Sequence, residues 1–150
     1  MSEHEYWLNT NLKDVFAIPE DAREWLLMLW NVIQVFDDMA DGDHPDRAAL
    51  ETAIADSLVN MPCNPFYLRN GHTLAPLMSV AILKWLAADK AEAAGNPSPM
   101  SFAWRAGFYD IVLAVVHIVH GDEVARNVCM EVMNLYGEDY AEYVGEFRNA

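Results

Sequence analysis

Residues 18–42, IPEDAREWLLMLWNVIQVFDDMADG, form the stretch of sequence that decides the fold. Its apolar residues recur at the spacing of an α-helix, and no window of the chain shows the sustained alternation of a strand. Pro19 and the two acidic residues after it suit the first turn of a helix, whereas Gly42 suits the position just past a helix end. The pattern therefore predicts a helix over residues 20–40.

The rest of the chain follows the same pattern. Asp43 is a suitable N-cap for a second helix, and Thr73 is a suitable N-cap for a third. Pro62, Pro65 and Gly71 indicate a loop between them. Further helices are expected at about residues 44–60, 74–94, 101–119, 122–136 and 138–147. The sequence predicts an all-α fold, a single-domain bundle of five to six helices over residues 1–150, with an N-terminal arm at 1–17 and a short C-terminal docking helix at 138–150.

Charge is the strongest signal in the composition. Nine basic residues face 23 acidic ones, which gives a net charge of −14. Such a surface repels phosphate backbones, so direct nucleic-acid binding is not expected, and it favours either a basic protein partner or solubility alone. No signal segment or membrane span is recognisable, so we expect a cytoplasmic protein that makes no membrane contact.

The acidic run at the end of the first helix is a candidate metal site. Asp37, Asp38 and Asp41 match the pattern DDxxD, in which carboxylates four residues apart share a helix face and suit Mg²⁺ or Mn²⁺. The motif resembles that of helical isoprenoid diphosphate synthases, and this resemblance implies metal binding at these three positions. Those enzymes are much longer, and their second metal-binding motif has no clear match here. The alternative is that the run only ends one helix and caps the next, with no cofactor.

The helix expected at residues 101–119 carries a second group of candidate residues. Arg105, Tyr109, Asp110, His117 and His120 occupy an arc opposite its apolar side. On the first helix, one polar stripe contains Glu20, Arg23, Glu24, Asn31, Gln34, Asp38 and Asp41. Because the residue types of the arc perform acid–base and ligand chemistry, we expect the arc to be partly enclosed and to share a cleft with this stripe. In an enzyme, Mg²⁺ would neutralise the oxygens of a phosphate or diphosphate ester, Arg105 would assist and His117 would be the general base. Asp110 and His117 would each contribute one ligand to a site shared with the first helix. A packed histidine and an ion-paired aspartate are the simpler interpretations.

A broader resemblance rests on NPFYLRNGHTLAPLMSVAILKWLAADKAE (residues 64–92) and WRAGFYDIVLAVVHIVHG (residues 104–121). Both segments resemble small helical proteins of unknown function encoded by tailed bacteriophages. The matching positions are Asn64-Pro65-Phe66-Tyr67, Pro76, Trp85, Arg105 and Asp110. This resemblance implies a helical fold and supplies no activity.

Three functions follow as hypotheses. The first is an acidic, phage-encoded protein that acts in the host cytoplasm by binding a basic host or virion protein. The second is Mg-dependent binding or hydrolysis of a phosphate or diphosphate ester at the DDxxD cluster. The third is a homodimeric structural protein, joined through aromatic residues such as Trp7, Tyr140 and Phe147.

Overall fold

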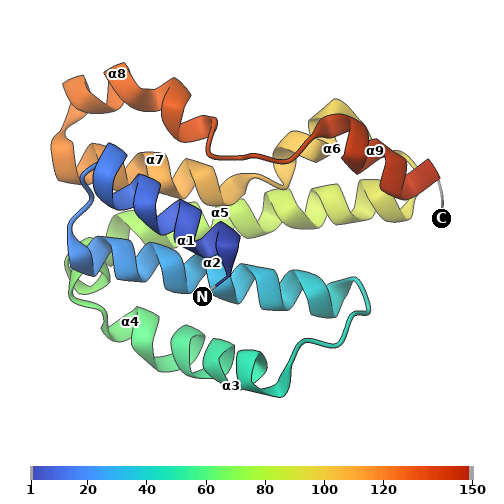
Figure 1. Cartoon of the computed structure of the whole chain (residues 1–150), viewed down its shortest axis with the longest axis horizontal. Helices are drawn as coiled ribbons and strands as arrows, with labels where there is room; N and C mark the ends of the chain where they lie inside the picture. Colours follow the sequence, from blue (N-terminus) through green and yellow to red (C-terminus); the bar gives the residue numbers. More distant parts are fainter. Residues whose placement is uncertain (1, 149–150) are drawn as a thin grey trace. The chain divides into compact units, whose positions relative to one another are not determined.

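A computed structural model of the chain describes residues 2–148, which are helical without any strand (Figure 1). The all-α prediction is confirmed. The predicted number of five to six helices is too low, because eight are present in these residues when the three-residue α4 is counted with α3. The chain falls into two compact units, Met1–Gly71 and His72–Ala150, which are described separately below. The prediction of a single domain stays a prediction.

The first unit is built on the long helix α2 (Glu20–Ala40). Its apolar residues pack inward, with Trp25, Leu26, Leu29 and Val32 buried. The predicted bounds of this helix are confirmed, and Gly42 follows its end with φ +84°, a conformation that favours glycine. Helix α1 (Glu3–Thr10) continues into the π-helical turn η1 (Asn11–Val15) and packs on α2.

A second helical rod of the first unit runs back alongside α2 and packs against it (Figure 1). It consists of α3 (Arg47–Ala55), the π-helical turn η2 (Asp56–Asn60) and the short α4 (Met61–Cys63). Asp56 and Met61, at the two junctions, keep helical backbone angles, so the rod is continuous. The N-cap of α3 is Asp46, which accepts a hydrogen bond from the Ala48 N–H at 3.4 Å, and not Asp43 as predicted.

Two segments that lie outside the predicted helices are helical. The N-terminal arm contains α1 and η1, and the loop expected at residues 61–72 contains α4 and the start of α5 (Pro65–Ala93). Asn64 caps α5, because its side-chain oxygen accepts from the Tyr67 N–H at 3.1 Å, and Pro65 occupies the first helical position. Gly71 and Pro76 lie inside α5, although proline in a helix interior costs about 3 kcal/mol.

The second unit contains residues 72–93 of α5 followed by four helices: α6 (Pro99–Trp104), α7 (Gly107–His120), α8 (Asp122–Met133) and α9 (Tyr140–Arg148). Helices α7 and α8 form a hairpin around Gly121, whose φ is +88°. The single helix predicted at 101–119 is divided into α6 and α7. Helix α6 begins earlier than expected, because Ser98 and Ser101 form a capping box.

Gly107 permits a close approach between α7 and α5. A Cβ atom at this position would lie 2.9 Å from the Ala81 Cβ and 3.1 Å from the Ala81 Cα. Any larger residue would therefore push these helices apart. This contact fixes the position of the start of α7 relative to α5, and with it the positions of the polar residues in the first turn of α7.

Candidate functional site

The aspartates of the DDxxD motif lie in the last turn of α2 and at its C-cap. Asp38 and Asp41 are exposed, and Asp37 is half-buried. Within residues 2–148, no group of three or more His, Cys, Asp or Glu side chains is arranged to hold a metal ion. Metal binding by Asp37, Asp38 and Asp41 therefore stays a prediction that rests on the motif alone.

The polar residues predicted on the fourth helix do not form one enclosed group. Asp110 makes an ion pair with Lys84 of α5 at 2.6 Å, and both side chains are partly exposed. His117 lies 3.7 Å from Asp122, and its side chain is 58% exposed. Partial enclosure of the arc is confirmed for Tyr109, which is buried, and for Arg105, whose side chain is 18% exposed. It is wrong for His117, which has ready access to water. Its role as a general base stays a prediction.

The polar stripe predicted on the first helix is also largely exposed. Glu24, Gln34, Asp38 and Asp41 are exposed along α2. The half-buried Asn31 donates a hydrogen bond to Glu5 of α1 at 3.2 Å. The stripe is thus mainly the solvent-facing side of a helix that buries its opposite side, the commoner arrangement for such a pattern. The cleft predicted between this stripe and the fourth helix stays a prediction.

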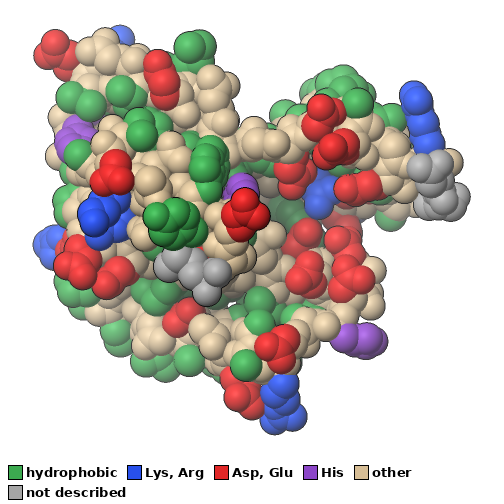
Figure 2. All heavy atoms as spheres, in the orientation of Figure 1, with side chains coloured by type: hydrophobic (Ala, Val, Ile, Leu, Met, Phe, Trp, Pro, Cys, Tyr) green, Lys and Arg blue, Asp and Glu red, His purple; other side chains and the backbone are tan. Residues whose placement is uncertain are grey.

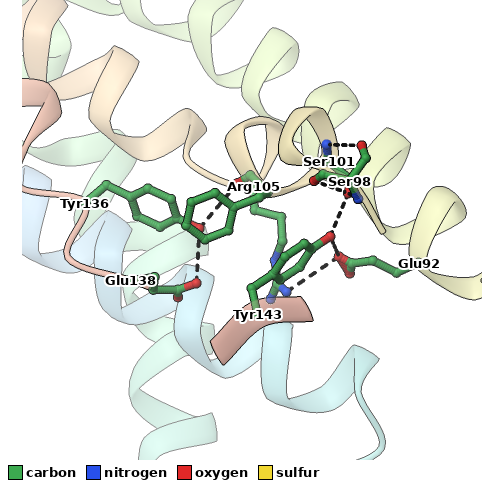
Figure 3. Close-up of polar contacts among 8 residues, drawn as sticks. Glu92, Ser98, Ser101, Arg105, Tyr136, Glu138 and Tyr143 are labelled. Carbon is green, nitrogen blue, oxygen red and sulfur yellow. Dashed lines mark hydrogen bonds and ion pairs between the residues drawn. The ribbon is translucent and has the colours of Figure 1, made fainter. Parts of the chain in front are cut away.

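Arg105 belongs to a partly buried polar network that the sequence did not reveal (Figure 3). Its guanidinium lies 3.5 Å from the Glu92 carboxylate and 5.6 Å from the centre of the Tyr143 ring. The Tyr143 hydroxyl donates to Glu92 at 3.1 Å and lies 2.7 Å from the hydroxyl of the fully buried Ser101. The network joins the end of α5, the start of α6 and α9.

Aromatic rings surround this network. Phe102 lies in contact with Tyr136, Tyr140 and Tyr143, with ring centroids 5.1–5.5 Å apart. Burial raises the pKa of Tyr109 to about 12, and the nearby Glu138 carboxylate acts in the same direction. Burial also raises the pKa of Tyr136, whose hydroxyl lies 3.0 Å from Glu138. These tyrosines stay neutral at physiological pH and serve as packing and hydrogen-bonding groups.

The network is the contact surface on which the C-terminal helix α9 packs. Tyr143 is buried in it, and its partners Glu92 and Ser101 cannot be recognised from the sequence. The ion pair between Arg105 and Glu92 satisfies two groups that would be costly to bury alone. The arrangement therefore supports the fold, while chemistry at Arg105 stays a prediction.

The most distinctive feature of the first unit is its charge. Residues 1–71 contain thirteen acidic and four basic residues, a net charge of −9, whereas residues 72–150 contain ten and five, a net charge of −5. Seven of the acidic residues fall between positions 37 and 56, where Arg47 is the single basic residue. Arg47 is paired with Glu51 at 2.9 Å. Acidic side chains gather around the end of α2 in Figure 2.

Comparisons with protein-family models, with curated proteins and with solved structures found no match for this chain. Within residues 2–148, none of the helices combines the length and the apolar character that crossing a membrane requires.

Proposed function

We propose that this chain acts by protein–protein interaction and that its partner is a basic protein. The observation that carries the proposal is the placement of charge, with a net charge of −9 on residues 1–71 and a run of seven acidic residues against one arginine. Most of these carboxylates are exposed: Asp38, Asp41, Asp43, Asp46 and Glu51.

The end of α2 adds to this electrostatic character. The C-terminus of a helix carries a partial negative charge, which cations in the last turn normally offset. The last turn of α2 has no basic residue, and Asp37 and Asp38 lie within it. Negative charge is thus concentrated where the helix dipole is also negative. A cationic protein surface would relieve this repulsion on binding.

Charge complementarity of this kind speeds association and selects among partners. It disfavours nucleic acid and anionic lipid, because both carry phosphate charges of the same sign as this surface. The resemblance to phage-encoded helical proteins points to a host or virion protein as the basic partner.

The proposal can be tested by capturing proteins from a host-cell lysate on the immobilised chain at low salt. We expect basic proteins to bind and to elute as salt is raised, because exposed charges are screened over about 10 Å at 0.1 M salt. The matched variant carries Asp38→Asn, Asp41→Asn and Asp43→Asn. Loss of the basic proteins from this variant would support the proposal, whereas an unchanged set of captured proteins would contradict it.

A further inference from the structure

The apolar face of α2 extends beyond the part of the helix that is covered. Positions 25, 29, 32, 36 and 39 follow one another at intervals of four and three residues, so they share one side of the helix. Trp25, Leu29 and Val32 are buried on this side. Phe36 and Met39 continue it, yet they are 49% and 50% exposed. The last two turns of α2 thus present large apolar side chains to the solvent.

The rod formed by α3 and η2 shows a second set of uncovered apolar residues. Ile54 is 48% exposed, Leu58 is 72% exposed and Val59 is 56% exposed. Leu58 and Val59 lie in the π-helical turn η2, one turn beyond Ile54. Irregular turns of this type occur frequently at functional sites.

Both sets lie on the segment of the chain that carries the most acidic residues. We name the five exposed apolar residues and the carboxylates between them the α2–α3 surface: Phe36, Met39, Ile54, Leu58 and Val59, with Asp38, Asp41, Asp43, Asp46 and Glu51. Helix α3 and the π-helical turn η2 pack against α2, so these apolar residues and carboxylates are carried by neighbouring elements. Exposed apolar side chains combined with charged groups are typical of a protein-binding surface.

We infer that the α2–α3 surface binds a basic amphipathic segment of the partner protein, with apolar side chains on Phe36, Met39, Ile54, Leu58 and Val59 and Lys or Arg side chains on the carboxylates. This inference rests on the proposed function and specifies where and what the chain binds. The negative charge of the α2–α3 surface favours a basic segment over a second copy of this chain as its binding partner. A second copy of this chain would bring the same seven acidic residues to the interface, whereas a basic segment offsets them. Helices with an apolar side and a basic side are recognised by acidic, apolar surfaces in this way.

The test uses a fluorescent synthetic helix made of Lys and Leu, with all Leu on one face, as the probe. A scrambled peptide of the same composition, which cannot gather its Leu residues on one face, is the peptide control. Binding to the whole chain is measured by fluorescence anisotropy at two salt concentrations. Light scattering of the same samples identifies self-association of the chain.

Two pairs of variants separate the apolar contribution from the charge contribution. Ile54→Ser with Leu58→Ser is matched by Val80→Ser with Leu83→Ser, which alters similarly exposed residues on α5. Asp38→Asn, Asp41→Asn and Asp43→Asn together are matched by Glu123→Gln, Glu131→Gln and Glu142→Gln, so that both triple variants have a net charge of −11. Circular dichroism confirms that each variant is folded.

We expect the first variant of each pair to weaken binding of the amphipathic probe about tenfold, and its matched control to weaken it less than about twofold. The scrambled peptide should bind with no sensitivity to Ile54→Ser and Leu58→Ser. Equal effects of both triple variants, or no effect of the two serine substitutions, would overturn the location while leaving the proposed function standing. Failure of both peptides to bind at low salt would overturn both. Dimers that dissociate when Leu58 is replaced would show that a second copy, and not a basic segment, occupies the surface.

Discussion

Replacing Tyr143 by phenylalanine should loosen the C-terminal helix without disturbing its packing. The ring of Tyr143 contacts Phe102 and Phe147, each with centroids 5.2 Å apart, and phenylalanine keeps these contacts. The substitution removes only the hydroxyl, which lies 2.7 Å from Ser101 and 3.1 Å from Glu92. The change therefore isolates the polar part of the contact surface for α9.

The size of the effect follows from the partners that are lost. A hydrogen bond between neutral groups contributes about 0.5–1.5 kcal/mol, and one to a charged group contributes about 1.5–3 kcal/mol. Ser101 retains contacts with Ser98, and Glu92 retains its ion pair with Arg105, so neither is left unpaired. The cost of losing both hydrogen bonds should therefore lie at the lower end of the sum of these two ranges. We expect Tyr143→Phe to destabilise the docked state of α9 by about 2 kcal/mol.

Hydrogen exchange of the α9 amides, followed by mass spectrometry, measures this change directly. A cost of about 2 kcal/mol corresponds to exchange that is about thirtyfold faster when α9 opens locally. Tyr140→Phe, at an exposed tyrosine of the same helix, is the matched control and should leave the exchange rate nearly unchanged. Acceleration of less than about threefold for Tyr143→Phe would refute the view that its hydroxyl holds α9 in place.

Three further predictions concern stability. Gly107→Ala should lower the free energy of unfolding by about 1–3 kcal/mol, because its new Cβ would lie 2.9 Å from that of Ala81; urea denaturation measures the loss, and an unchanged midpoint would contradict the close approach. Asn64→Ala should lower the free energy of unfolding by about 2 kcal/mol in the same assay, because Asn64 caps α5 and also donates to the Asp21 carbonyl at 2.9 Å. A decrease of less than about 0.5 kcal/mol would argue against the cap. The third concerns pH. The pKa of Tyr109 is about 12 in the folded chain and near 10 when unfolded. The contribution of neutral Tyr109 to the free energy of unfolding is therefore complete below pH 10 and is lost as pH rises toward 12. Tyr109→Phe should flatten the fall of urea stability in that window, and an unaltered slope would contradict this assignment.

The sequence predicted α2 well because every local signal agrees there. The apolar residues keep the helical period over six turns, Pro19 precedes the first helical residue and Gly42 follows the C-cap. The segment at residues 61–72 shows the opposite case. Pro62 and Pro65 predict a loop there, although proline is also favoured in the first turn of a helix. In the structure, Asn64 is a cap and Pro65 begins the first turn that follows it. Local sequence cannot distinguish these uses of proline.

The polar contacts were unpredictable for a different reason. Lys84 and Asp110 are 26 residues apart, and Tyr143 reaches Glu92 across 51 residues. Helical spacing places a residue on one face of its own helix, but it does not determine which residue of another helix lies opposite. The sequence therefore indicates Arg105 as a candidate functional residue but does not indicate its partner Glu92. The choice between a catalytic arginine and a paired one depends on that partner.

The acidic run at the end of α2 is the point at which charge, local structure and proposed function meet. The exposed carboxylate of Asp38 in the last turn opposes the helix dipole, at a cost of about 0.3–1 kcal/mol at low salt. Phe36 and Met39, on the same turns, add the cost of apolar surface left in water. Neither feature helps the isolated chain to fold. Both become favourable when a basic, apolar segment covers them, whereas a metal ion would offset the carboxylates and leave the apolar residues exposed. The combination at one helix end therefore favours a protein partner over a metal ion as the ligand of this surface.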